Sequence, residues 1–177
     1  MQATSPDVEE LNRDTLEGVS NVKSTPTLNP FRAALAAMSD QVKTLNPSIV
    51  EELEEAARTS NRGAGNKFNA QVTITDDGKK FPSRKEANEY LALRLLERAG
   101  VISRLELQPK FVLQRANKKK GVKQVKYTPD FKYLDNQTGR VTIIETKGVK
   151  TADFIVRHNL FVAWLKEHHA DWVFIVK

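Results

Sequence analysis

The residues most able to do chemistry are two carboxylates and a lysine in two neighbouring segments. Asp130 follows Pro129, and after fourteen intervening residues comes Glu145, with Lys147 two positions further on, so the pattern reads P-D-x14-E-x-K. Successive side chains of a strand point to opposite faces, so Glu145 and Lys147 are predicted to share one face. Two carboxylates without a thiol partner form a hard oxygen site, which suits Mg²⁺ or Mn²⁺.

The segments around these residues predict a hairpin. Residues 126–134 and 141–146 are rich in the aromatic and β-branched residues of strands, and the polar residues 135–140 between them form the turn. If the strands pair, Asp130, near the middle of the first strand, approaches Glu145. An exposed, salt-bridged rim is the ordinary alternative. The apolar run before Glu145 instead favours a buried central strand, where an unpaired carboxylate is costly.

The other elements of this half of the chain surround the hairpin. Their predicted order is helix, three strands, helix, strand. The prediction rests on apolar residues at helical or strand spacing and on the residues that end each run. They are a helix over 83–99 stopped by Gly100, a strand segment over 102–113, the two hairpin strands, a helix over 151–168 and a strand over 172–176.

Glu86, at the start of the first of these helices, has two competing interpretations. Ser83-x-x-Glu86 is a capping box, in which Glu86 reaches back to the Ser83 amide. Alternatively, Glu86 points into the site as a further metal ligand, with Glu89 on the same helix as the substitute candidate. Both interpretations stay open at this point.

Four short motifs occur in a fixed order, and together they resemble the PD-(D/E)XK nuclease superfamily. They are F-x-S-x-x-E from Phe81, L-Q-P-x-F from Leu107, Y-x-x-D-F from Tyr127 and E-x-K-G from Glu145. The likeness is greatest to small phage-borne endonuclease-like proteins and more distant to the end-cleaving subunit of heteromeric transposases. It covers residues 67–177 and implies an α/β fold with a restriction-endonuclease-like core, a mixed β-sheet flanked by helices in the order α-β-β-β-α-β.

Phosphodiester hydrolysis is the chemistry that this set of residues predicts. Lys147 would orient the attacking water and stabilise the charged transition state. Gln108 would position the water or the phosphate, or would simply be a polar residue at a strand end. The expected ligands of the Mg²⁺ or Mn²⁺ ion are Asp130, Glu145, the backbone carbonyl of Thr146, and Glu86.

The distribution of charge indicates a polyanionic partner. The chain of 177 residues carries a net charge of +6; residues 1–59 hold 5 basic and 10 acidic residues, whereas residues 60–177 hold 23 and 12. A basic field of this kind attracts phosphate backbones, although a merely well-solvated surface would look similar. DNA is the expected partner. Its expected contacts are Lys118, Lys119, Lys120 and Lys123 around a hairpin tip, with Lys150 and Arg157 as second candidates.

The N-terminal third is predicted to be a separate part. Residues 1–29 are expected to be disordered, 30–59 to form an acidic helical arm and 60–66 a linker. The arm contains two predicted helices, over 31–40 and 47–58. Its glutamates at positions 51, 52, 54 and 55 would form a solvated face, a shield for the basic groove or a docking surface. In the last case the arm would bind a second copy of the chain, as a homodimer, or a partner in a recombination complex.

Several classes of protein are disfavoured. Without cysteine there is no disulfide or thiolate metal site, and no apolar run is long enough for a membrane span. The first residues lack a signal peptide's features, so a cytoplasmic protein is expected, in the host cell if it is phage-encoded. Neither a Ser-His-Asp arrangement nor a Gly-rich phosphate loop in its proper context is present.

The predicted function is therefore a Mg²⁺-dependent DNA endonuclease, a hydrolase acting in phage replication, recombination or DNA processing. Branched DNA is one candidate substrate. The alternative is a non-catalytic nucleic-acid-binding or assembly subunit of a recombination or transposition complex.

Overall fold

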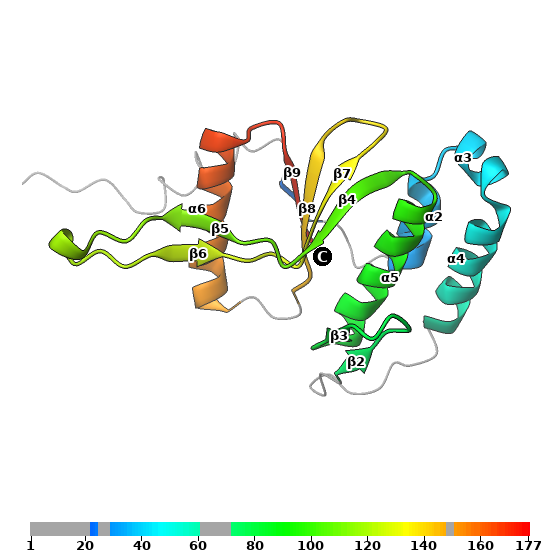
Figure 1. Cartoon of the computed structure of the whole chain (residues 1–177), viewed down its shortest axis with the longest axis horizontal. Helices are drawn as coiled ribbons and strands as arrows, with labels where there is room; N and C mark the ends of the chain where they lie inside the picture. Colours follow the sequence, from blue (N-terminus) through cyan, green and yellow to red (C-terminus); the bar gives the residue numbers. More distant parts are fainter. Residues whose placement is uncertain (1–21, 25–28, 61–71, 148–150) are drawn as a thin grey trace, which may run out of the picture.

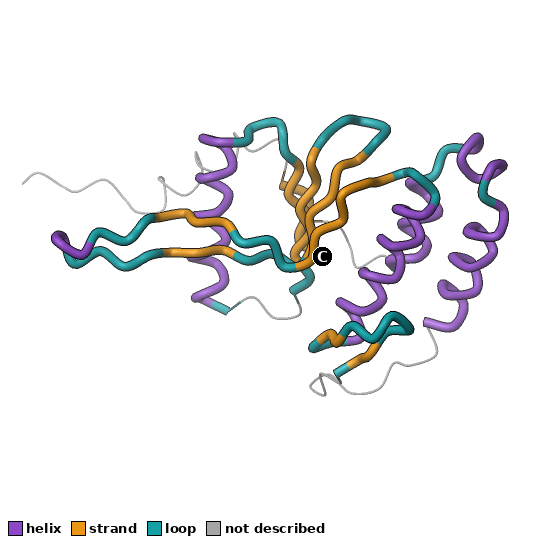
Figure 2. The backbone as a smooth tube through the Cα atoms, viewed as in Figure 1, coloured by secondary structure: helices purple, strands orange, loops and turns teal. Residues whose placement is uncertain are grey.

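A five-stranded mixed sheet forms the centre of the molecule (Figures 1 and 2). The structure, a computed structural model, describes residues 22–24, 29–60, 72–147 and 151–177. Along the sheet the strand order is β1-β9-β8-β7-β4. The strands are β1 (Val22–Ser24), β4 (Ile102–Leu107), β7 (Phe131–Asp135), β8 (Val141–Glu145) and β9 (Val173–Val176).

The connections of the sheet follow the predicted order of elements. Helix α5 (Arg84–Arg98) precedes β4, and β4, β7 and β8 pair as antiparallel neighbours. Helix α6 (Ala152–His168) then leads to β9, which joins β8 in parallel. The prediction of an α/β fold with a mixed sheet and flanking helices is confirmed.

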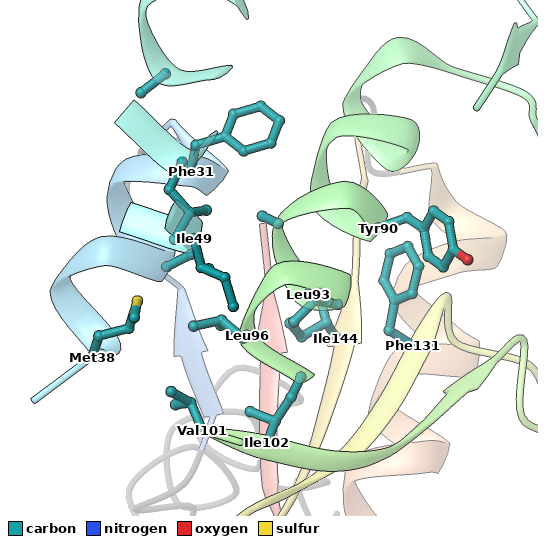
Figure 3. Close-up of a cluster of buried hydrophobic side chains, with 14 of the residues drawn as sticks. Phe31, Met38, Ile49, Tyr90, Leu93, Leu96, Val101, Ile102, Phe131 and Ile144 are labelled. Carbon is teal, nitrogen blue, oxygen red and sulfur yellow. The ribbon is translucent and has the colours of Figure 1, made fainter. Parts of the chain in front are cut away.

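Two hydrophobic layers lie against this sheet. Phe131 and Ile144 belong to a cluster with the buried residues of α5, part of which Figure 3 shows, whereas Ile143 belongs to a cluster with Phe161 of α6. Because adjacent side chains of a strand alternate between faces, consecutive apolar residues such as Ile143 and Ile144 pack into opposite layers. This explains why β8 is apolar almost throughout, and it makes β8 a buried central strand, as predicted.

Two predicted strands are each broken in two. The segment 102–113 divides after β4, where Gln108 has a φ of 48° and Pro109 follows; the segment 126–134 divides around Pro129. A residue with left-handed backbone angles turns the chain out of the strand direction, and a proline lacks the N–H that pairing with a neighbouring strand needs. Neither strand therefore continues. The prediction of continuous strands was wrong at both places. The freed pieces, β5 (Phe111–Gln114) and β6 (Val125–Tyr127), form a separate hairpin with a 3₁₀ turn, η1 (Lys118–Lys120), at its tip.

Within the described residues, three helices lie between β1 and β2 (Thr73–Ile74) where two were predicted. They are α2 (Pro30–Ala37), α3 (Asp40–Leu45) and α4 (Pro47–Ser60). The helix predicted over 31–40 ends early because Met38 is extended and the Ser39 hydroxyl accepts from the Val42 amide, which starts α3. The helix predicted over 47–58 is present and extends to Ser60.

The predicted arm differs from what the structure shows, because its helices are a layer of the core. Phe31, Ile49 and Leu53 lie in the same buried cluster as Leu93 and Leu96 of α5 (Figure 3). Leu53 has no exposed surface. The apolar face of each short helix needs a partner to be stable, and α5 supplies it. Residues 30–59 are therefore not a free appendage.

The remaining expectations for the N-terminal third concern residues mostly outside the described ranges. Of residues 1–29, predicted to be disordered, 22–24 form β1, paired in parallel with β9, and Asn29 caps α2. That part of the prediction was wrong, because the edge of β9 offers unpaired backbone groups to a short strand. The linker expected at 60–66 lies outside the described residues except for Ser60, which ends α4.

None of the helices in the described ranges is long and apolar enough to cross a membrane.

Candidate active site

Asp130 lies beside the end of β8. It occupies the break between β6 and β7, rather than the middle of a strand as predicted, and its N–H donates to the Ile144 carbonyl at 3.1 Å. The backbone N–H and the hydroxyl of Thr146 both donate to Asp130 Oδ2, each at 2.6 Å. The pairing of β7 with β8 thus places Thr146 where its two hydrogen bonds orient the Asp130 carboxylate. Such bonds are strong because the acceptor is charged.

Glu145 is the last residue of β8, and only 8% of its surface is exposed. The Tyr127 hydroxyl donates to its Oε2 at 3.4 Å. Burial, assisted by the negative charge of Asp130, raises the pKa of Glu145 to about 7, against the opposing effect of the Lys147 ammonium. A carboxyl group with this pKa is poised to change charge near neutrality.

Lys147 extends the same strand face beyond β8. Its N–H donates to the Lys177 carbonyl at 2.9 Å, and the Lys177 N–H donates to the Glu145 carbonyl at the same distance. The ladder with the end of β9 therefore continues past Glu145. Glu145 and Lys147 line one hollow of about 230 Å³, as their spacing predicted. The ammonium lies 5.2 Å from the centroid of the Phe154 ring, within range of a cation–π contact.

Glu86 shares a second hollow, of about 220 Å³, with Asp130 and Gln108. The Ser83 hydroxyl accepts from the Glu86 N–H at 3.2 Å, which confirms the predicted cap. The Glu86 carboxylate accepts from the Ser83 hydroxyl at 3.1 Å, where the prediction had it reach the Ser83 amide. Burial and the charge of Asp130 raise the pKa of Glu86. Glu86 thus takes part in the cap and is also electrostatically coupled to the site. The substitute candidate, Glu89, is buried and accepts from the Lys177 ammonium at 2.6 Å.

Gln108 is exposed at the rim of this second hollow. Its N–H donates to the Asp130 carbonyl at 2.8 Å, so the turn after β4 is fastened to the turn before β7. The structure therefore places the predicted catalytic and metal-binding residues along two adjoining hollows. They are Asp130, Glu145, Thr146, Lys147, Glu86 and Gln108.

The predicted contacts to nucleic acid divide into two groups. The three lysines of η1 and Lys123 are exposed on the β5–β6 hairpin, which runs away from the sheet in Figure 1. Arg157 of α6 lines the hollow that contains Glu145, where its guanidinium meets the Asp153 carboxylate at 3.1 Å. Lys150 lies outside the described residues.

Two residues of the site were not predicted. Tyr127 stacks on Phe161 with ring centroids 4.3 Å apart, and burial raises the pKa of its hydroxyl, so it remains a proton donor toward Glu145. The tyrosine of the Y-x-x-D-F motif was the available signal. Lys85 is half-buried, and burial lowers the pKa of its ammonium, while the charges of Glu89 and, to a smaller extent, Asp130 oppose that shift. No pattern in the sequence distinguishes it from the other lysines.

The two hollows adjoin where Thr146, next to Glu145, donates to the Asp130 carboxylate, and the carboxylates on either side influence one another. Asp130 raises the pKa of both Glu86 and Glu145, and Lys147 lowers both only in part. In the part of the chain that the structure describes, no three Asp, Glu, His or Cys side chains are grouped closely enough to hold a metal ion. Ligands for a cation would therefore have to include backbone carbonyls and water as well as carboxylates.

The two roles of Glu86 can be separated with matched variants. Glu86→Gln keeps an acceptor for the Ser83 hydroxyl but removes the charge beside Asp130. We expect it to reduce cleavage on the order of 10- to 100-fold with little change in the free energy of unfolding. Ser83→Ala should do the reverse, costing about 1 kcal/mol of stability and leaving cleavage near wild type. Rates and urea denaturation measured on both variants test this, and an active Glu86→Gln would leave Glu86 with capping alone.

Stability in the absence of divalent cations should depend on Glu145. Because its pKa in the folded protein lies above the ordinary value of 4.5, Glu145 contributes most at low pH, and this contribution is lost as pH rises through about 7. We expect the stability of Glu145→Gln to match that of wild type at about pH 4 and to exceed it at about pH 8, by at most about 3 kcal/mol. Urea denaturation in EDTA gives the free energies. Parallel pH profiles for the two proteins would refute the assignment.

Comparison with known proteins gives a family but no activity. The family DUF1064, described as a protein of unknown function, matches residues 65–177. No curated protein and no solved structure matches the chain. The matched residues include the sheet from β4 to β9, both hollows and the β5–β6 hairpin.

Proposed function

We propose that this chain, which belongs to the DUF1064 family, is a metal-dependent DNA endonuclease that hydrolyses phosphodiester bonds at the junction of its two hollows. One observation carries the proposal. Asp130, Glu145 and Lys147 meet at the adjoining ends of β7 and β8, where Thr146 fixes the first carboxylate and burial and charge perturb the second. Perturbed carboxylates beside a lysine are typical of catalytic sites rather than of surface ion pairs.

We further propose that the sheet and its two helices form a restriction-endonuclease-like core. The support is the path of the chain, which runs from α5 through the antiparallel strands β4, β7 and β8 and then through α6 to the parallel strand β9. Asp130, Glu145 and Lys147 lie at the adjoining ends of its neighbouring strands β7 and β8, as the resemblance to the PD-(D/E)XK nucleases implies.

The residues of the site suit a magnesium or manganese ion. Burial and the charge of Asp130 raise the pKa of both Glu86 and Glu145, so a cation among these carboxylates would relieve repulsion that Lys147 offsets only partly. The proposed protein ligands are Asp130, Glu145 and the Thr146 carbonyl, with Glu86 acting next to them or through water; all are oxygens, which hard cations prefer. Such an ion would polarise the phosphate and lower the pKa of bound water.

The side chains around these ligands have separate roles. The Lys147 ammonium, held near the Phe154 ring, would stabilise the charge that develops on the phosphate. Tyr127 would keep the Glu145 carboxylate in place through its hydroxyl. Gln108, at the rim beside Asp130, would orient the phosphate or the attacking water. Arg157 and the basic β5–β6 hairpin would hold the backbone of the substrate without reading its sequence.

Cleavage is expected to require a divalent cation. Purified protein would be incubated with supercoiled, linear and branched DNA in the presence of Mg²⁺, Mn²⁺, Ca²⁺ or EDTA, and the products separated by electrophoresis. Mg²⁺ and Mn²⁺ should support cutting, whereas Ca²⁺ should bind and support little turnover, because it holds its ligands less rigidly. Cutting of supercoiled circles would establish an endonuclease. Undiminished cleavage in EDTA would exclude the proposed chemistry.

A non-catalytic nucleic-acid-binding or assembly subunit is the second candidate. It is favoured by the absence, within the described residues, of a three-residue metal cluster, and by the basic hairpin, which would suffice for binding. It leaves the arrangement of Asp130 and Glu145 without a purpose, because two carboxylates facing phosphate weaken binding. The same experiment distinguishes the two, since this candidate predicts binding with no cleavage under any condition.

A further inference from the structure

The β2–β3 hairpin, formed by Thr73–Ile74 and Lys80–Phe81, lies at the mouth of the hollow that contains Asp130. Lys79, Lys80 and Phe81 line this hollow together with Glu86 and Asp130. In Figure 1 this hairpin and the β5–β6 hairpin lie on different sides of the marked C-terminus. Glu145 lies next to that end of the chain, because its carbonyl accepts from the Lys177 N–H.

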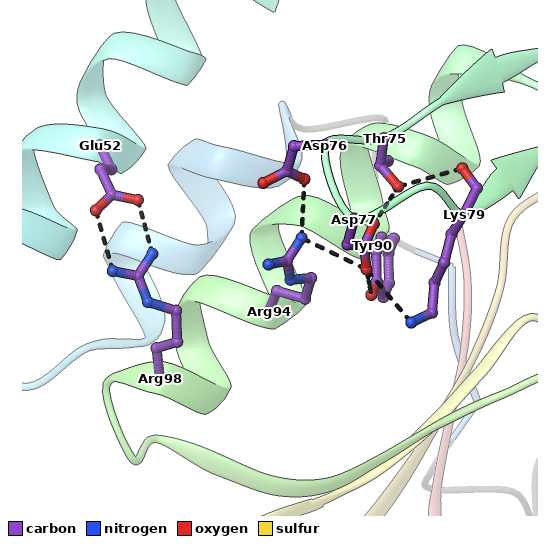
Figure 4. A network of polar contacts seen from close by, with 8 residues as sticks. All are labelled: Glu52, Thr75, Asp76, Asp77, Lys79, Tyr90, Arg94 and Arg98. Atoms are coloured by element: carbon purple, nitrogen blue, oxygen red, sulfur yellow. Dashed lines mark hydrogen bonds and ion pairs between the residues drawn. The ribbon is translucent and has the colours of Figure 1, made fainter.

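A network of charged and polar side chains fastens the hairpin to α5 (Figure 4). The Asp77 carboxylate accepts from the hydroxyls of Thr75 and Tyr90, each at 2.5 Å, and lies 3.6 Å from the Arg94 guanidinium. Arg94 also pairs with Asp76 at 2.9 Å. The hydrogen bonds from Thr75 and Tyr90 hold the pKa of Asp77 well below its usual range, so it stays ionised.

This network compensates for the small size of the hairpin. Strands of two residues are not stable on their own, and nothing in the proposed catalysis needs Asp77 or Tyr90. Phe81 adds an aromatic contact to Tyr90, with ring centroids 4.9 Å apart. The result is a fixed hairpin on the helix that also carries Glu86.

The two lysines of the hairpin have different surroundings. The Lys79 ammonium is engaged inside the network, 3.3 Å from Asp77 and 5.3 Å from the centroid of the Tyr90 ring. Lys80 is exposed and alternates along β3 with the buried Phe81, so it points away from the Tyr90 side and toward solvent at the mouth of the hollow. Lys80 therefore offers an exposed positive charge on a fastened hairpin, in the lining of the hollow that contains Asp130.

We propose that the β2–β3 hairpin is a clamp for the backbone of the nucleic acid. Lys80 binds a phosphate on one side of the bond that is cut, and the β5–β6 hairpin holds phosphates on the other side. This rests on the proposed function, and it narrows the substrate to a polynucleotide that continues on both sides of the bond to be cut. An enzyme that trims ends would need contacts on one side only.

Binding to duplex DNA tests the clamp without requiring cleavage. In full-length protein carrying Glu145→Gln, the Kd for a labelled duplex would be measured over a range of salt concentrations. Lys80→Ala should weaken binding several-fold and reduce the salt slope by about one unit, as the loss of one phosphate contact does. Replacing the three lysines of η1 by alanine should reduce the slope independently. Lys43→Ala, on α3 at the other end of the helical layer in Figure 1, is the matched control and should change neither quantity.

The fastening network is tested by combining variants. Asp77→Asn should weaken binding when Lys80 is present and have little effect when Lys80 is already alanine, because its role is to position that lysine. A merely structural role would weaken both proteins equally. In cleavage-competent protein, shortening the duplex on one side of the cut should abolish the effect of Lys80→Ala, and shortening it on the other side should abolish the effect of the η1 variant.

The outcomes separate this inference from the proposed function. Unchanged affinity and salt slope in Lys80→Ala, alongside a loss in the η1 variant, would overturn the clamp and leave the nuclease standing. A loss in Lys80→Ala, in a protein that cuts no DNA under any condition, would keep Lys80 as a phosphate contact but refute the nuclease, and with it a clamp on two sides of a cut. A protein that binds no duplex at all would overturn both.

Discussion

Glu145→Gln and Asp130→Asn are each expected to reduce DNA cleavage by roughly 10³-fold or more while leaving DNA binding equal to or tighter than wild type. Each substitution keeps the size of the side chain and removes one negative charge. The catalytic loss follows because the neutral amide is a poor ligand for a hard cation. The retained binding follows because a carboxylate that repels phosphate has been removed.

The variants should remain folded, which makes the loss interpretable. An amide oxygen at position 130 can still accept from the N–H and hydroxyl of Thr146. At position 145 the neutral group is the form that burial already favours. Glu54→Gln, the same change on the exposed face of α4, is the matched control and should cleave normally.

Lys147→Ala separates binding from chemistry in a different way. It should lose cleavage while the affinity for the divalent cation, followed by calorimetry, changes little. Wild-type cleavage rates in any one of the Asp130, Glu145 or Lys147 variants would show that the site has been placed wrongly.

Removal of residues 1–59 is expected to abolish stable folding, although this part of the chain contains none of the proposed catalytic residues. Its helices cover α5, and without them the apolar side chains of Leu93 and Leu96 would face water. The sequence alone predicted a separate acidic arm, whose loss a folded core would survive. Burial in a shared cluster makes the opposite outcome the expected one.

A point substitution tests the same packing without truncation. Leu53→Ala, at a position with no exposed surface, should lower the free energy of unfolding by about 2–5 kcal/mol. Arg98→Ala, which removes the 2.8 Å ion pair with Glu52 at the exposed edge of the same contact, should cost no more than about 1 kcal/mol. Urea denaturation of both variants, with circular dichroism of the 60–177 fragment, provides the measurements. A fragment that is as stable as the full chain would restore the independent arm.

Local patterns were sufficient for the elements that carry the site. Helix α5 begins at the Ser83 cap and ends before Gly100, and β8 is apolar up to Glu145, because capping and alternation act over a few residues. The approach of Asp130 to Glu145 was also predictable, since they flank a single turn and the pairing of β7 with β8 brings them together. Asp130, Glu145 and Lys147 could therefore be named before the fold was known, whereas Lys85 could not.

Contacts between distant segments decided the rest. Pro109 and Pro129 are local signals that the strands break, but whether β5 and β6 then leave the sheet as a hairpin depends on the partners that each piece finds. The packing of Leu53 on α5 joins surfaces about 40 residues apart, and the network of Asp77 with Tyr90 turns an ordinary polar turn into a fixed hairpin. The amino-acid sequence determines which side chains can do the chemistry. The tertiary structure decides what holds them and which surfaces surround them, because complementary packing and charge act between segments that no short pattern connects.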